Sequence, residues 1–173
     1  MLEVFKPEIL RNERDYKKLS ELLIRFKDVD MKKLPHAFTH GDIINTNVMK
    51  DNNGKLWIID FAVSNYLPRI VDLAVSSCNL CLNPESIKET RSKTKMILKE
   101  YEKYNKLTDY EKEVFPIFFD IANAMGILQI SYLISQGEAS EEDKFWYNES
   151  EKGLEFSDNN FWNGIFEEDE IER

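Results

Sequence analysis

A long apolar stretch in the second half of the chain restricts its fold more than any other feature. Residues 114–135 are mostly apolar over about the length of helix that crosses a bilayer. They include Asp120, Asn123 and Gln129, however, and both flanks are rich in charged residues. Carboxylates are rare inside membranes, and a helix at the centre of a globular domain is also apolar on nearly all sides. We therefore expect a buried core helix rather than a membrane span.

The size and composition of the chain fit one globular domain around that helix. Its 173 residues are enough for one hydrophobic core and too few for two ordinary domains. The formal net charge of -9 argues against binding to nucleic acid or to anionic membranes, since both are bound by basic patches. Two cysteines are too few for a disulfide-rich secreted scaffold, and the first residues lack the pattern of a signal peptide. We expect a cytoplasmic protein that binds neither nucleic acid nor membrane.

Apolar periodicity and capping residues predict the remaining helices. Thr108 and Glu111 form a capping-box pattern at the start of the apolar helix, and Gly137 is a typical end for it. Asp72 is a candidate cap for a helix that runs to about Leu82. Further helices are expected from Pro7 to about Asp28, from Asn83-Pro84 onward, and from Ser140 onward.

A small β-element lies between the first helix and the others. Residues 37–40 are a short strand candidate, and residues 48–50 and 55–59 are two more. The segment Asp51-Asn52-Asn53-Gly54 that separates the last two is typical of a hairpin turn, because Asn and Gly tolerate positive φ. The expected fold is therefore mainly α with a small β-hairpin (α+β), in a single domain over residues 1–173.

Polar residues cluster at the two ends of the predicted hairpin. His40-Gly41-Asp42 follows the first strand, Asn47 lies five residues after Asp42, and Asp60 follows the last strand. Because a hairpin brings its ends together, Asp42, Asn47 and Asp60 are expected to converge. Two carboxylates and an amide oxygen suit Mg²⁺, whose coordination is commonly completed by water and by a nucleotide's phosphates.

The same residues carry a resemblance to a known family. The run HGDIINTN followed by IIDF resembles the aminoglycoside phosphotransferase family of small-molecule kinases, which has choline kinase-like and homoserine kinase-like members and a protein-kinase-like fold. The resemblance covers residues 36–75, including Asp72-Leu73-Ala74. It implies a C-terminal catalytic lobe, with the catalytic loop and metal-binding hairpin in residues 36–75 and a helical acceptor-binding part in residues 76–173.

The resemblance also implies a role for each matched residue. Asp42 would be the catalytic residue, which accepts or orients the proton of the acceptor hydroxyl as that hydroxyl attacks the γ-phosphate of ATP. Asn47 and Asp60 would hold Mg²⁺ and, through it, the phosphates; GTP is an alternative donor. His40 would brace the loop and Asp72 would anchor it. A catalytic base at His40 and a purely capping role for Asp72 are the alternatives.

Members of that family also have an N-terminal nucleotide-binding lobe, for which this sequence offers no candidate. The six glycines form no G-x-G-x-x-G, and only one predicted helix precedes the catalytic loop. We therefore expect the C-terminal lobe alone, inactive by itself, with an exposed apolar surface that favours self-association. Two functions remain: an ATP-dependent phosphotransferase acting on a small-molecule hydroxyl, or a non-catalytic, truncated lobe that associates with a partner.

Two further patterns have both a structural and a functional interpretation. Cys78-Asn79-Leu80-Cys81 is a C-x-x-C inside a predicted helix without a second ligand pair, so buried small hydrophobic residues are expected rather than a zinc site. The acidic residues from Glu138 to Asp169 are either a solvated face or the lining of a pocket for a cationic acceptor. Aminoglycosides, choline and amino alcohols fit that second interpretation, and homoserine fits the catalytic motif equally well.

Overall fold

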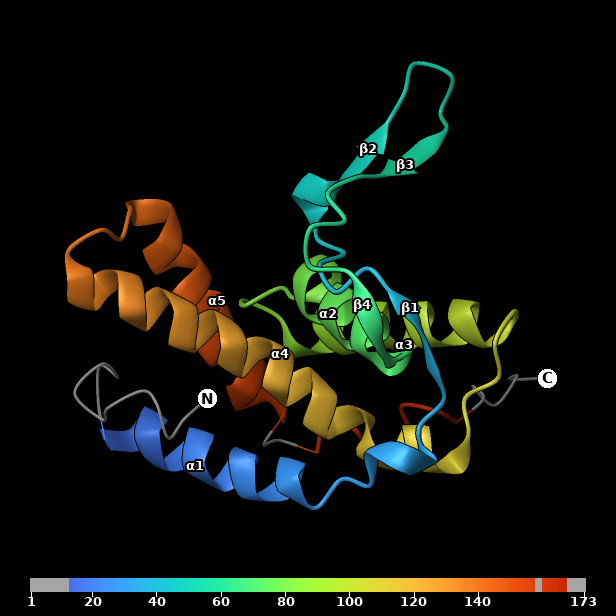
Figure 1. The fold of residues 1–173 in the computed structure, drawn as a ribbon, viewed down its shortest axis with the longest axis horizontal. Helices are drawn as coiled ribbons and strands as arrows, with labels where there is room; N and C mark the ends of the chain where they lie inside the picture. The colour runs from blue at the N-terminus through green and yellow to red at the C-terminus, as the bar shows by residue number, and fades with distance from the viewer. Residues whose placement is uncertain (1–12, 158–159, 168–173) are drawn as a thin grey trace.

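The computed structural model describes residues 13–157 and 160–167, and it is mainly helical with two small antiparallel sheets (Figure 1). This confirms the α+β class at a coarse level. The helices are α1 (Glu13–Lys27), α2 (Ile70–Cys81), α3 (Ile87–Glu102), α4 (Asp109–Gln136) and α5 (Glu141–Ser157). The strands are β1 (His36–Thr39), β2 (Val48–Lys50), β3 (Leu56–Ile58) and β4 (Asn65–Pro68), with short 3-10 turns at Met31–Lys33 and Asn45–Asn47.

The apolar helix α4 is the central element of the helical body. Its N-terminal half shares one apolar cluster with residues of α2 and α3, which includes Phe115 and Phe118, and its C-terminal half shares a second cluster with α1 and α5, which includes Ile127 and Leu128. By length and composition α4 could cross a membrane, but half of its most apolar window is buried inside the structure. The capping box at Thr108 and the end at Gly137, whose φ is 74°, are both confirmed.

Two polar residues of α4, Asp120 and Asn123, are buried and contact other parts of the protein, whereas Gln129 is exposed. Asp120 accepts from the Arg25 guanidinium of α1 at 3.2 Å. Asn123 donates through Nδ2 to the Phe119 carbonyl at 3.0 Å and to the Cys78 sulfur at 3.2 Å. Buried polar groups normally require such partners. These contacts account for the presence of Asp120 and Asn123 within an otherwise apolar helix.

Two predicted helix starts are wrong. The helix α2 begins at Ile70, so Asp72 lies in its first turn and does not cap it. The helix α3 begins at Ile87 with Ser86 as its N-cap, whose hydroxyl accepts the Glu89 N–H. Asn83, the predicted cap, instead accepts the Glu85 N–H in the preceding turn. The helix predicted from Pro7 ends at Lys27, close to the expected Asp28, while its predicted start lies outside the described residues.

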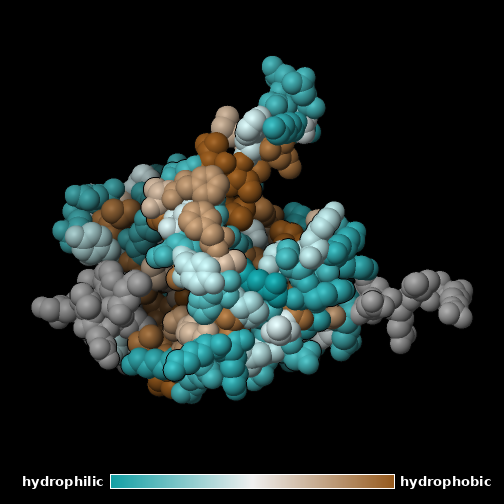
Figure 2. Space-filling view, turned by 45° about the vertical axis from the view of Figure 1, so that its right-hand side comes forward, coloured by the Kyte–Doolittle hydropathy of each residue, from teal (hydrophilic) through white to brown (hydrophobic). Residues whose placement is uncertain are grey.

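The strands form two separate pairs. The predicted hairpin is confirmed: β2 pairs with β3 from Val48–Ile58 to Lys50–Leu56. The predicted strand at residues 37–40 is also confirmed, since β1 covers His36–Thr39; its antiparallel partner β4 was not predicted. The hairpin projects from the helical body (Figure 1), and hydrophobic residues gather at its base while its tip is hydrophilic (Figure 2).

Close approach of α4 and α5 requires a glycine at position 153. A Cβ atom built on Gly153 would overlap the side-chain oxygen of Asn123. The same amide group is held in place by the two hydrogen bonds that its nitrogen donates. An alanine there would have to displace a buried, hydrogen-bonded amide.

We therefore expect Gly153→Ala to lower the free energy of unfolding by about 1–3 kcal/mol, the usual cost of overpacking a core. At an open helical position, replacing Gly by Ala stabilises the protein by about 0.5–1 kcal/mol. The sign of the change in unfolding free energy therefore distinguishes a close contact from an open position. Urea unfolding followed by circular dichroism measures the effect. The control Lys144→Ala, on an exposed part of α5, should stay within about 0.5 kcal/mol of the wild type. A gain in stability for Gly153→Ala would contradict the close contact.

Candidate functional site

The loop after β1 is held by a carboxylate in the first turn of α2. Asp72 accepts the His40 N–H at 2.9 Å through Oδ2 and the Gly41 N–H at 2.7 Å through Oδ1. Bonds of this kind, between a charged acceptor and backbone donors, are among the stronger hydrogen bonds in proteins. Gly41 has a φ of 82°, and a Cβ there would lie 3.3 Å from the Val63 carbonyl oxygen. The backbone path immediately before Asp42 is therefore fixed by Asp72 and by the glycine.

The imidazole of His40 connects this loop to the end of β3. It is buried, with Nε2 2.9 Å from the Ile59 carbonyl oxygen and Nδ1 3.2 Å from the Asp42 nitrogen. The ring also makes an edge contact with Phe61, at a centroid distance of 4.5 Å. An N–H donor at Asp42 and a carbonyl acceptor at Ile59 favour the neutral tautomer with its proton on Nε2. Both ring nitrogens thus contact backbone groups, which favours bracing over proton transfer.

Asp42 and Asn47 are in direct contact. The Asn47 amide donates through Nδ2 to the Asp42 side chain at 2.9 Å and to the Asp42 carbonyl at 3.0 Å. Asn47 is buried, and its own carbonyl accepts the Ile59 N–H at 3.0 Å. Both side-chain bonds use the amide nitrogen, so Asn47 Oδ1 is the atom left to contact a cation.

Asp60 lies at the same end of the hairpin. Its neighbours on either side contact the loop, since Ile59 bonds to Asn47 and Phe61 packs on His40. Asp60 has a φ of 63°, a left-handed conformation that aspartate tolerates better than most residues. Its carboxylate is exposed and accepts the Ala62 N–H at 3.3 Å. The hairpin thus brings the backbone of Asp60 beside the loop that carries Asp42 and Asn47.

The oxygen atoms at this end of the hairpin suit a cation that arrives with its own ligands. Among the described residues, no three His, Cys, Asp or Glu side chains come close enough to hold a metal ion by themselves. The donors here are fewer: the Asp60 carboxylate and Asn47 Oδ1. Mg²⁺ is commonly bound by one or two protein oxygens, with water and substrate phosphates completing its octahedron. The residues therefore fit Mg²⁺ carried by a nucleotide better than a resident ion.

A buried ion pair fixes the helix that carries Asp72. Arg69, at the start of α2, donates to both oxygens of Glu111 at 2.7 and 2.8 Å and to the Lys106 carbonyl at 2.6 Å. Glu111 is fully buried and also accepts the Thr108 N–H. Burial alone would raise the pKa of Glu111, but the hydrogen bonds and charge of Arg69, with those of Thr108, outweigh it and lower the pKa. Sequence reasoning assigned Glu111 only to the capping box and missed this pair.

The two cysteines are buried in α2, as expected of small hydrophobic residues. Cys78 donates to the Phe119 carbonyl at 3.3 Å. Burial raises the pKa of Cys81 to about 11 and raises that of Cys78 well above its ordinary value. Metal binding and nucleophilic reactions both require the thiolate, so neither thiol is suited to them at neutral pH.

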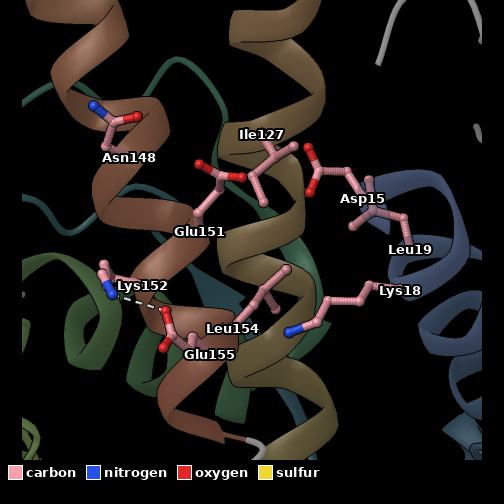
Figure 3. A pocket seen from close by; sticks show the side chains of 9 residues that line it. All are labelled: Asp15, Lys18, Leu19, Ile127, Asn148, Glu151, Lys152, Leu154 and Glu155. Atoms are coloured by element: carbon pink, nitrogen blue, oxygen red, sulfur yellow. Dashed lines mark hydrogen bonds and ion pairs between the residues drawn. The ribbon is translucent and has the colours of Figure 1, made fainter. Parts of the chain in front are cut away.

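The acidic segment after Glu138 contributes to a cavity of about 310 Å³ between α1, α4 and α5 (Figure 3). Glu151 and Glu155 of that segment line it, but so do Lys18 and Lys152, and Lys152 pairs with Glu155 at 2.8 Å. A lining with charges of both signs does not select a cationic acceptor. Helix α1, which forms one wall of the cavity, lies on the opposite side of α4 from the hairpin (Figure 1). The last part of the acidic segment, at positions 168 and 169, is outside the described residues.

No protein-family model matches this chain, and no curated protein matches it significantly. Any functional assignment therefore depends on the residues between His40 and Asp72 and on their geometry.

We expect Arg69→Met to lower the free energy of unfolding at pH 7 by about 3–5 kcal/mol, because it leaves Glu111 charged and buried without its partner. In the wild type the pKa of Glu111 is lowered, so its stabilising contribution is present above the unfolded-state pKa and is lost as the pH falls through the folded-state pKa. In the variant only the Thr108 hydrogen bonds still oppose the effect of burial, so the pKa of Glu111 should rise. The loss of unfolding free energy relative to the wild type should therefore shrink as the pH is lowered.

Urea unfolding at several pH values measures this dependence. The control Lys103→Met removes an exposed pair with Glu100 and should change stability by less than about 1 kcal/mol at any pH. If the difference in unfolding free energy between Arg69→Met and the wild type stayed constant from pH 7 into the acid range, this would argue against an ionised, buried Glu111.

Proposed function

We propose that the chain is the C-terminal catalytic lobe of an ATP-dependent phosphotransferase that transfers the γ-phosphate to a hydroxyl of a small molecule. The observation that carries this proposal is the Asp72 carboxylate, which holds the N–H groups of both His40 and Gly41. The next residue, Asp42, is in contact with Asn47, and Asp60 lies at the same end of the hairpin. The resemblance of residues 36–75 to the aminoglycoside phosphotransferase family supports the same function.

In this proposal Asp42 accepts the proton of the acceptor hydroxyl as its oxygen bonds to the γ-phosphorus and the bond to the leaving ADP oxygen breaks. The Asn47 amide holds the Asp42 carboxylate in one orientation through Nδ2. Mg²⁺, held by Asn47 Oδ1 and Asp60, would neutralise charge on the β- and γ-phosphate oxygens. Positioning and electrostatics dominate phosphoryl transfer, so a few fixed oxygens suffice on this side of the nucleotide.

The nucleotide requires a second binding partner in this proposal. Six glycines are present in the sequence, and they form no phosphate-covering motif. A separate nucleotide-binding lobe would have to cover ATP or GTP from the other side. The acceptor is a small hydroxyl compound, and the net charge of -9 favours a cationic one.

A specific observation also favours the second candidate, a non-catalytic lobe that binds a partner protein. Ile59 and Phe61, on either side of Asp60, are both exposed. Large apolar side chains beside a polar loop are typical of protein interfaces. The two candidates differ in whether the Asp42 carboxylate is needed for a chemical step.

Phosphorus NMR of the chain with ATP, Mg²⁺ and a panel of an aminoglycoside, choline and homoserine tests the proposal. A β-rich nucleotide-binding lobe of an aminoglycoside phosphotransferase is added in trans or fused to the chain. We expect transfer to one class of acceptor only with that lobe present. Asp42→Asn should lower the rate by about 10²–10⁴-fold, the usual contribution of a positioned base.

Asp51→Asn is the matched control, because Asp51 belongs to the same hairpin but lies in its turn, where its Oδ1 accepts the Lys55 N–H. Asparagine can retain that acceptor, so this variant should keep the wild-type rate. Equal rates for Asp42→Asn and wild type would exclude Asp42 as the base. Absence of transfer under all these conditions would favour the non-catalytic candidate.

A further inference from the structure

Helix α5 carries a buried carboxylate that has no role in the candidate catalytic site. Glu149 is only 9% exposed, and its side chain makes no hydrogen bond or ion pair with the described residues. Both lysines of α5 are paired elsewhere, Lys144 with Glu141 and Lys152 with Glu155. Buried carboxylates are normally bonded to donors or paired with a cation. The carboxylate of Glu149 therefore lacks the partner that its burial requires.

A second carboxylate lies near Glu149. Glu85 is exposed in the segment between α2 and α3, and this segment extends towards α5 (Figure 1). Burial raises the pKa of Glu149, and the negative charge of Glu85 raises it further. The two carboxylates are thus close enough to repel one another, and no described cation offsets the repulsion. A bound cation would relieve it.

An amide oxygen from α4 faces the same turn of α5. A Cβ atom on Gly153 would overlap Asn123 Oδ1, and helical Cβ atoms tilt towards the N-terminus of their helix. Asn123 Oδ1 therefore lies beside the turn before Gly153, where Glu149 is, and the two α5 positions share a face. Asn123 is 4% exposed; its nitrogen donates two hydrogen bonds, whereas its Oδ1 accepts none from the described residues. This oxygen is a third acceptor directed at the same place.

An apolar border adjoins these oxygens. Phe145 and Trp146 precede Glu149 by four and three positions, so they lie beside it one helical turn earlier. Their rings meet edge to face at a centroid distance of 5.2 Å and are partly open to solvent. Aromatic rings attract organic cations through their faces and pack against carbon chains. Oxygens beside aromatic rings favour an organic cation over a metal ion.

We propose that Glu149, Glu85 and Asn123 bind the primary ammonium group of a small organic amine. The carbon chain of the amine lies against Phe145 and Trp146. A primary ammonium group has three N–H donors, as many as the two carboxylates and Asn123 Oδ1 can accept. None of these residues lines the cavity between α1, α4 and α5, and none belongs to the hairpin or its loop. The proposal is therefore independent of the phosphotransferase activity.

Titration of the full chain with n-butylammonium, followed by amide NMR at constant ionic strength, tests the proposal. We expect saturable shifts at Glu85, at Asn123 and at residues 149–153, with a dissociation constant of about 1 mM. Tetramethylammonium carries the same charge without an N–H donor, and 1-butanol has the same carbon chain without a charge. Each of these two compounds should bind at least about tenfold more weakly, because hydrogen bonds to the charged acceptors are lost.

Glu149→Gln should weaken the binding of n-butylammonium by at least about tenfold. This variant should fold, because it replaces a buried charge by a neutral side chain of similar shape, and circular dichroism verifies this. Glu151→Gln is the matched control: it makes the same change on the same helix, but Glu151 lines the cavity. The control should bind n-butylammonium as the wild type does.

Several results would overturn the proposal. These are shifts that do not saturate, equal binding by Glu149→Gln and the wild type, and equal weakening by Glu149→Gln and Glu151→Gln. Equal affinity for tetramethylammonium and n-butylammonium would exclude hydrogen bonding by the three oxygens. Shifts confined to Ile127 and Asn148, which line the cavity, would place the amine there instead.

Discussion

The Asp72 carboxylate joins the helical body of this protein to its polar loop. Each hydrogen bond from a backbone N–H to a charged acceptor contributes about 1.5–3 kcal/mol, so the two bonds to His40 and Gly41 are a substantial constraint on so short a segment. Asp72 is itself held because Arg69, one turn earlier in sequence, is bonded to the buried Glu111 of α4. An uninterrupted series of contacts thus runs from the central helix to the residue before Asp42.

The elements that were predicted correctly have local causes. The turn residues Asp51 to Gly54 specify the hairpin, and Thr108, Glu111 and Gly137 specify the ends of α4. The contact between Asp42 and Asn47 is also local, since they lie five positions apart. In each case the determining residues lie within one turn or one loop, where sequence patterns are most informative.

The features that local sequence patterns did not indicate depend on residues far apart in the chain. Asp72 resembles a helix cap in sequence, but α2 begins two residues before it. Only the family resemblance implied that Asp72 anchors the loop, and its carboxylate bonds to residues more than thirty positions earlier. Arg69 and Glu111 are separated by 42 positions, and no local pattern connects them. Strand β4, which contains Asn65 and Pro68, has little intrinsic β-propensity and forms because β1 lies beside it. Tertiary contacts determine the role of Asp72, the ion pair and the formation of strand β4.

Polar and apolar groups occupy neighbouring surfaces of the same hairpin. Polar groups at its base, from His40 to Asn47 and at Asp60, offer oxygen ligands, whereas Ile58, Ile59 and Phe61 are exposed apolar side chains. A partner that covered Ile59 and Phe61 would also lie beside Asp60. Such a partner, for example a nucleotide-binding lobe, would therefore influence how a metal–nucleotide complex reaches the Asp60 carboxylate.

We propose that Asn47 and Asp60 form one cation-binding end of the hairpin beside Asp42. Paramagnetic broadening by Mn²⁺ with ATP, recorded in amide NMR spectra of the full chain, tests this claim most directly because even weak binding broadens nearby signals. The account predicts selective loss of signals from residues 42–47 and 59–61, with the hairpin tip at Asn52 and Asn53 less affected. Broadening confined to the acidic helix α5, with the signals of Asn47 and Asp60 unchanged, would contradict it.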